Sequence, residues 1–211
     1  MTATSIGLVP GTNTDIAALA VSQYQDVYRD GPRDVMRERW LITDARQWPA
    51  GTPDATVVAD AGKLANATGA LLRYDRTGPG EVYYDLFRLD YHEERLSHRA
   101  LGHILTDGQL AVRDDALPRE SVVRLFQSKM SSGRIAVAPS FPLRDALREQ
   151  VERFMGGFQK RGAAAAEEEP NTLLLACMFA TYRKSFRSGD PDYLARNGKV
   201  YPYRSLSPDT Y

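Results

Sequence analysis

An aspartate that follows a short apolar run is the first candidate for chemistry in this chain. Asp60 comes directly after residues 56–59, Thr-Val-Val-Ala, which we predict to form a buried strand, and a loop of small residues follows it. A carboxylate at the end of a core strand is held rigidly enough to ligate a divalent cation. Asp60 is therefore a candidate metal ligand. Its alternative role is that of a turn residue that bonds nearby backbone groups.

Basic residues in two regions are candidates for binding phosphate. Lys63 and Arg73 lie close to Asp60 in the sequence, and Arg196, Lys199 and Arg204 are interleaved with tyrosines near the end of the chain. Basic side chains meet phosphates and aromatic rings stack on bases, so this mixture predicts contact with nucleic acid. The same residue types also serve as solvated surface charge or as anchors for a protein partner.

Composition restricts the class of protein. The chain has 211 residues, of which 26% are charged and 43% hydrophobic, and its formal net charge is +0. A nucleic-acid partner must therefore be held by a local basic patch. The single cysteine, Cys177, excludes an intrachain disulfide and is expected to pack in a core helix, while the three histidines are expected at the surface. We recognise no signal peptide or membrane span, so we expect a cytoplasmic protein (host cytoplasm if viral) with no membrane partner.

The elements that must position these residues divide the chain into three parts. Residues 1–50 are predicted to be an arm with a helix over 15–28, residues 51–188 the main domain, and residues 189–211 a basic and aromatic tail. Apolar periodicity and turn residues in the main domain predict strands over 56–59, 70–74, 81–90, 109–113 and 134–138, and helices over 93–105, 119–129, 142–154 and 171–186. A three-strand meander followed by alternating helices and strands predicts an α/β fold, a mixed sheet flanked by helices. This is the element order of the ribonuclease H-like fold.

Four segments, in this order, carry a resemblance to a known family. They are the Asp60 strand with its small-residue loop ending at Gly69, the strand ending at Asp114, the Gly-Arg-Ile strand over 133–139, and the apolar helix that begins at Asn171. Together, over about residues 55–182, they resemble the nuclease domain of phage large terminases, the enzymes that cut viral DNA during packaging.

The resemblance implies a DNA endonuclease that works by a two-metal mechanism. The Mg²⁺ or Mn²⁺ ions would be held by Asp60, Asp114 and Glu169. Where the family has aspartate before its closing helix, this chain has Pro170-Asn171-Thr172, so Glu169 or Glu168 would substitute from just upstream. The resemblance also implies double-stranded DNA as a partner. Because the sequence has no Gly-x-x-x-x-Gly-Lys-Ser/Thr loop, a separate packaging ATPase or other viral assembly proteins are further expected partners.

Two other functions remain open. The first is a catalytically inactive ribonuclease H-like scaffold or adaptor in a viral packaging or virion assembly, because a fold does not fix a function. The second is a relative of the actin-like ATPases, which share this fold. Such a protein needs a second glycine-rich phosphate loop, and residues 102–116 supply only Gly102 and Gly108.

Overall fold

The first half of the sheet is built from the N-terminal residues. The structure, a computed structural model, describes residues 2–12, 15–27, 37–98, 100–107, 116–161 and 171–182. Three strands, β1 (Thr2–Val9), β2 (Ala17–Val27) and β3 (Arg37–Trp48), form an antiparallel meander. The predicted helix over residues 15–28 is therefore wrong for the described residues, and the predicted arm over 1–50 supplies the meander itself. The helical prediction failed because β2 is central and buried on both faces, which hides its period of two.

The second half of the sheet adds parallel strands on both sides of the meander. The strands are β4 (Leu71–Asp75), β5 (Leu101–Thr106), β6 (Ala116–Pro118) and β7 (Ile135–Val137). The spatial order is β6-β5-β4-β1-β2-β3-β7, with β4 parallel to β1, β5 to β4, β6 to β5, and β7 to β3. In the ribonuclease H-like fold, the fourth strand pairs in parallel with the first strand of the meander, and the fifth strand pairs in parallel with the fourth. The same order is found here. The predicted fold class, a mixed sheet with flanking helices, is confirmed.

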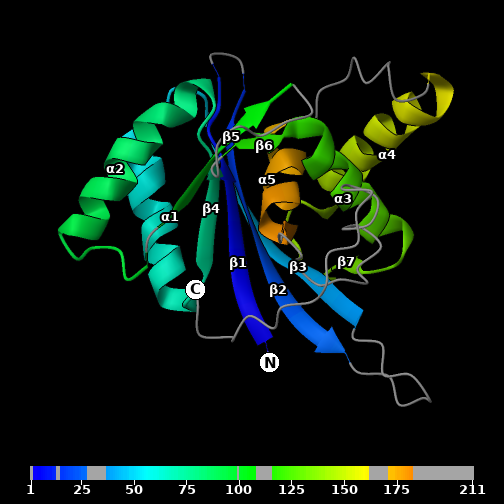
Figure 1. The fold of residues 1–211 in the computed structure, drawn as a ribbon, viewed down its shortest axis with the longest axis horizontal. Helices are drawn as coiled ribbons and strands as arrows, with labels where there is room; N and C mark the ends of the chain where they lie inside the picture. Colours follow the sequence, from blue (N-terminus) through cyan, green and yellow to red (C-terminus); the bar gives the residue numbers. More distant parts are fainter. Residues whose placement is uncertain are drawn as a thin grey trace, which may run out of the picture.

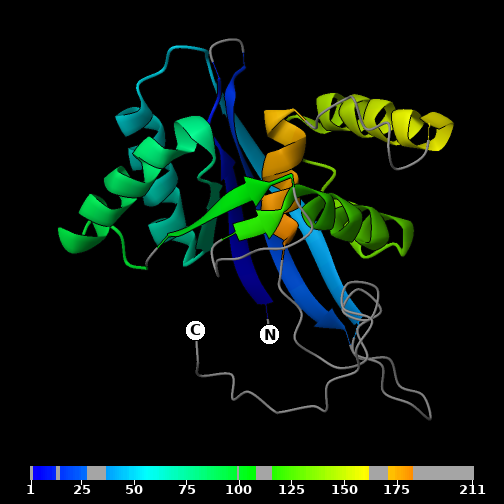
Figure 2. The ribbon, with the colours of Figure 1, turned by 45° about the horizontal axis from the view of Figure 1, so that its top comes forward.

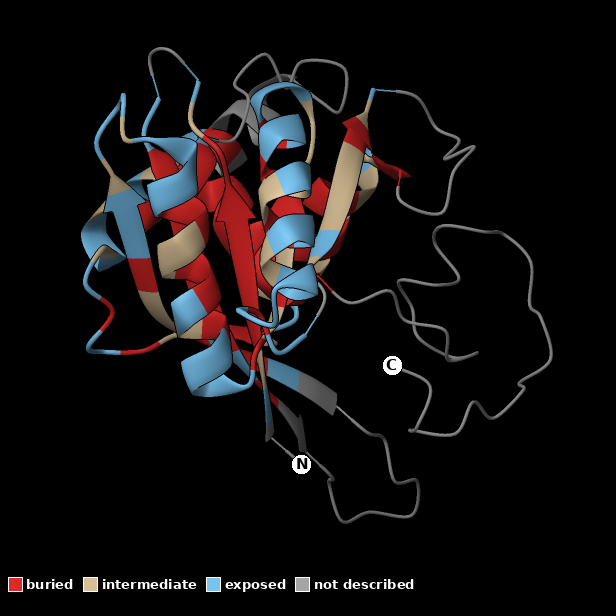
Figure 3. Cartoon of the chain, turned by 90° about the vertical axis from the view of Figure 1, so that its left-hand side faces the viewer, coloured by how far each residue is buried: buried red, intermediate tan, exposed pale blue. Residues whose placement is uncertain are grey.

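Helices cover both faces of the sheet, as Figures 1 and 2 show. They are α1 (Asp54–Thr68), α2 (Glu81–His92), α3 (Arg119–Ser131), α4 (Arg144–Arg161) and α5 (Thr172–Thr181), and a short 3₁₀ turn, η1 (Gly78–Gly80), precedes α2. The first two helices enclose one hydrophobic core and the last three enclose the other. Figure 3 shows the exposed outer surface of α1 and α2 in front of the buried strands. No described helix is long and apolar enough to cross a membrane.

Small residues on β1 and β2 let α5 lie directly on the centre of the sheet. A Cβ at Gly7 would stand 2.1 Å from the carbonyl oxygen of Ala176 and 2.4 Å from the backbone nitrogen of Ala180. Ala18 and Ala20 of β2 pack in the same core as α5. Every residue of α5 is buried, so this helix belongs to the core and is not a surface covering.

Three further predicted elements have the wrong type. Residues 56–59 belong to α1, residues 81–90 to α2, and part of the predicted helix over 93–105 is β5. In α1 the buried residues recur at helical spacing, for example at Val57, Val58, Ala61 and Ala65. In α2 only Tyr83 and Phe87, four positions apart, are buried, so the apparent alternation was a helical stripe.

The other strands and helices predicted for the described residues are confirmed. Strands over 70–74 and 134–138 correspond to β4 and β7, and helices over 119–129, 142–154 and 171–186 correspond to α3, α4 and α5 with shifted ends. The predicted strand over 109–113 and the tail over 189–211 lie outside the described residues.

Candidate functional site

Asp60 lies on a helix, not at the end of a strand. Its carboxylate accepts a hydrogen bond from Trp48 Nε1 at 3.4 Å and lies 3.8 Å from the exposed ammonium of Lys63, one helical turn away. The hydrogen bond from Trp48 ties α1 to the end of β3. The described ranges contain no group of three or more His, Cys, Asp or Glu side chains that could hold a metal ion.

Of the other predicted site residues, the structure describes Lys63 and Arg73. Arg73 donates to the Ser5 hydroxyl at 3.1 Å across the β1–β4 pair, and it alternates with Leu72 and Tyr74, which enter the core under α1 and α2. Lys63 and Arg73 therefore lie on different faces of the sheet. The other five predicted residues lie outside the described ranges; they are Asp114, Glu169, Arg196, Lys199 and Arg204.

Sheet topology indicates a different place for a site. In open α/β sheets, ligands bind beyond the carboxyl ends of parallel strands where the chain switches direction. Here β1 continues into β2 on one side and pairs in parallel with β4 on the other, so the switch point lies at the ends of β1 and β4. The residues at these ends are Val9, Pro10 and Asp75.

Asp75 is the described carboxylate at this switch point. It is 8% exposed, and its Oδ1 accepts a hydrogen bond from the Thr77 backbone N–H at 2.8 Å. The Thr77 hydroxyl in turn accepts from the Leu105 N–H at 2.8 Å, which fastens the turn to β5. Burial raises the pKa of Asp75, while the Thr77 hydrogen bonds and the positive charge of Arg119 partly oppose that shift.

Apolar and backbone groups are packed near Asp75. Val9 is 4% exposed, and Pro10 packs so near the β4–α2 turn that a Cβ at Gly80 would stand 3.2 Å from its Cγ and 1.9 Å from the Asp75 carbonyl oxygen. At the start of α5, the Asn171 side chain accepts from the Leu174 N–H and so caps the helix. The described groups at this edge thus hold one another in place.

The described residues by themselves do not make up a two-metal centre. Such a centre needs several carboxylates converging on two cations. Among the described residues the ends of β1 and β4 supply one, Asp75, and its oxygen already binds Thr77. The chemistry that the described edge supports by itself is proton exchange at one buried carboxyl.

The fold is ribonuclease H-like by its strand order. In a comparison with solved structures, the chain is similar to the manganese-soaked, inhibitor-bound terminase nuclease domain of human cytomegalovirus, with 12% identity, coverage of 85% of this chain and 82% of that one, and a TM-score of 0.46. This is the kind of domain that the sequence resembles, but a likeness this weak shows neither a family nor a reaction for this chain. The sequence matches no protein-family model, and a search of curated proteins returns no match.

Two further side chains were assigned from the sequence with different success. His103 is the register partner of Asp75 on β5 and its ring stacks on Phe179 with centroids 6.1 Å apart, so this residue is half-buried and the expected surface position is wrong. Cys177 is fully buried in α5, as predicted. Burial raises the pKa of its thiol to about 12, so the thiol is protonated and is not a nucleophile.

Asp75 was missed because it is the last residue of β4, and that strand was predicted to end one residue earlier, at Tyr74. The available signal was an acid directly after the apolar run Leu-Leu-Arg-Tyr, before a turn containing Gly78, Pro79 and Gly80. Two groups of its surroundings are distant in sequence and gave no local signal: Leu105, which bonds to Thr77, and Arg119, whose charge acts on the Asp75 pKa.

The raised pKa of Asp75 makes a pH-dependent contribution to stability. Between its ordinary value of 3.8 and the raised value, the folded protein binds this proton more tightly than the unfolded chain, so stability falls as pH rises through that window. Asp75→Asn removes the titration, and its amide oxygen can still accept from Thr77. We expect the substitution to stabilise the protein more at pH 7 than at pH 4, as measured by urea denaturation. An equal effect at the two pH values would contradict the assignment.

Proposed function

We propose that this chain is a ribonuclease H-like scaffold or adaptor domain that acts by binding in a viral DNA-packaging or virion assembly, and that it does not cut DNA by itself. The observation that carries the proposal is the packing of the described switch point, where Asp75 Oδ1 accepts from Thr77 and Pro10 packs against the turn at Gly80. Substrate phosphate and two hydrated cations need an open, carboxylate-rich crevice at this position.

The end of β1 supports the same conclusion. Leu8 and Val9 are 0% and 4% exposed and belong to the two cores, so this strand end serves packing on both faces. A hydrated cation beside these side chains would have to displace apolar contacts that stabilise the fold.

A metal-dependent DNA endonuclease is the second candidate, and one observation favours it. A buried carboxyl with a raised pKa at the carboxyl end of a parallel strand is typical of functional sites. Under this proposal Mg²⁺ or Mn²⁺ would need Asp114 and Glu169 as ligands beside Asp75, and Asp60 would have no part because it lies on α1.

The proposed partners follow from the same assignment. Double-stranded DNA is one, with phosphate contacts from the basic residues Lys63, Arg196, Lys199 and Arg204. A separate packaging ATPase or another viral assembly protein is the other, because the sequence carries no Walker-type phosphate loop.

Incubation of the full chain with supercoiled plasmid and Mg²⁺ or Mn²⁺ distinguishes the two candidates. For the scaffold we expect no conversion to nicked or linear plasmid with either cation, and no metal binding by calorimetry. Cleavage that persists in Asp60→Asn and is lost in Asp75→Asn would establish the endonuclease. Cleavage unchanged in both variants would point to a contaminating nuclease, which repurification of Asp75→Asn then tests.

A further inference from the structure

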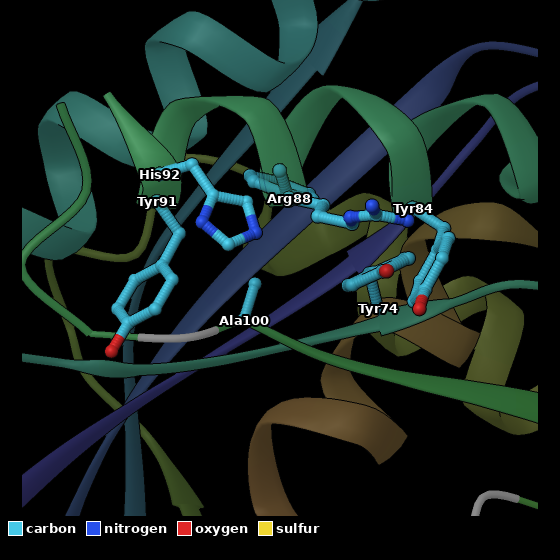
Figure 4. A pocket seen from close by; sticks show the side chains of 7 residues that line it. Tyr74, Tyr84, Arg88, Tyr91, His92 and Ala100 are labelled. Carbon is cyan, nitrogen blue, oxygen red and sulfur yellow. The ribbon is translucent and has the colours of Figure 1, made fainter. Parts of the chain in front are cut away.

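A small cavity lies on the opposite face of the sheet from Asp75, between α2 and the strands β4 and β5 (Figure 4). Tyr74 and Asp75 are adjacent on β4, so their side chains point to opposite faces, and Tyr74 forms part of the cavity. The volume is about 200 Å³. Because drug-sized ligands occupy about 300–1,000 Å³, the cavity has room for one small ring system.

The inner wall of the cavity is aromatic and rigid. Tyr74 and Phe87 are 1% and 2% exposed, and their ring centroids are 5.0 Å apart. Tyr84 stands beside them, held by the Arg76 guanidinium, which lies 3.8 Å from its ring centroid and pairs with Glu81. Tyr74 and Phe87 are almost wholly covered, so they form a rigid floor, and the exposed ring of the lining is that of Tyr91.

The mouth of the cavity carries positive charge. Arg88 and His92 are exposed and lie one helical turn apart on α2. In Figure 4 the Arg88 side chain extends toward Tyr84, and the His92 ring lies near Ala100. Arg88 forms no ion pair with any acidic side chain in the part of the chain that the structure describes.

No described acidic side chain lines the cavity. Asp90 and Glu93 both pair with Arg95. Glu94 lines an adjoining hollow, and Asp85 is exposed one helical turn before Arg88 but is not part of the lining, so Arg88 is the charged side chain of the cavity. An anionic group is therefore expected beside Arg88.

We propose that this cavity binds a nucleoside phosphate. The base stacks on Tyr91, which is 42% exposed, above the buried aromatic floor, and the phosphate meets Arg88 and His92. The source is a free mononucleotide or an unpaired nucleotide of a single strand. Duplex DNA is excluded, because a paired and stacked base cannot enter a cavity in the helix-covered face. The site is separate from the switch point and does not depend on whether the chain cuts DNA.

The test uses the full chain with two probes, fluorescein-labelled single-stranded (dT)10 by anisotropy and thymidine monophosphate by calorimetry. Arg88→Gln and Tyr91→Ala are each expected to raise the Kd about tenfold. Both residues are exposed, so the variants should retain the wild-type melting temperature. The matched control is Arg124→Gln, an exposed helical arginine of α3 on the other face, for which no change is expected.

Each outcome decides between the alternatives. Thymidine monophosphate that binds and displaces (dT)10 identifies the free nucleotide as sufficient, and (dT)10 binding without monophosphate binding identifies a single strand. The proposal is overturned if neither probe binds below about 1 mM, or if Arg88→Gln and Tyr91→Ala bind like the wild type. Equal weakening by Arg124→Gln would also overturn it, since that result indicates nonspecific charge attraction.

Discussion

Gly7→Ala is expected to lower the free energy of unfolding by about 3 kcal/mol. The new methyl group would stand 2.1 Å from the carbonyl oxygen of Ala176 and 2.8 Å from the Cβ of Phe179. Neither atom is the end of a flexible side chain, so α5 must move away from β1 as a unit. Such a shift loosens the contacts of a helix whose every residue is buried. Urea denaturation followed by far-ultraviolet circular dichroism measures the change.

The matched control is another glycine-to-alanine substitution, Gly62→Ala in the middle of α1. There the nearest atom to the new Cβ is the flexible Leu96 Cδ1, at 3.7 Å, an ordinary contact. Alanine is the better helix former, so we expect a gain of about 0.5–1 kcal/mol. If Gly7→Ala cost less than Gly62→Ala gains, α5 would not pack as closely on β1 as the structure has it.

Lys129→Ala is expected to lower the free energy of unfolding by about 3 kcal/mol. The side chain is 2% exposed, its ammonium donates to the Thr181 carbonyl oxygen at 2.7 Å, and it lies 4.9 Å from the Trp40 ring centroid. This interaction joins the end of α3 to the last turn of α5, where a cation is also favoured by the helix dipole. Alanine leaves both a cavity and a carbonyl oxygen without this donor.

Lys129→Met separates packing from hydrogen bonding. Methionine fills most of the space but donates nothing, so we expect a loss of about 1–2 kcal/mol, smaller than that of alanine. Thermal and urea unfolding of the two variants and the wild type give the order. A methionine variant as stable as the wild type would show that the Thr181 hydrogen bond adds no net stability, in which case the stem of the lysine is the part that matters.

The C-terminal half of the fold could be predicted from local signals, and the N-terminal half could not. Pro118 precedes α3, and Gly133 with φ 66° follows it, so both ends of that helix are marked in the sequence. In contrast, β2 is buried on both faces. The run Ala-Thr-Val-Val-Ala in α1 suits a strand as well as a helix until the later buried positions Ala61 and Ala65 are counted.

The candidate site was harder to predict because its position depends on the order in which the strands pair in the sheet. Asp60 was chosen from a strand that proved to be a helix, and the strand that does end in an acid, β4, was predicted with its acid left out. Nothing within a few residues of Asp75 reveals that Pro10 packs against the turn at Gly80. Nor does it reveal that Thr77, which bonds to Asp75, also bonds to Leu105. The cavity at α2 was missed for the same reason, since it requires α2 to be a helix over β4.

The seating of α5 on β1 and β2 has a consequence for the order in which the protein can fold. Ser22 bonds to Ala180 and Thr172 bonds to Ile16, pairs separated by 158 and 156 residues. One face of the first two strands thus has no covering until residues near 180 have left the ribosome, so the growing chain carries exposed apolar strands through most of its synthesis. Such long-range closure slows folding and favours association with chaperones or with other nascent chains.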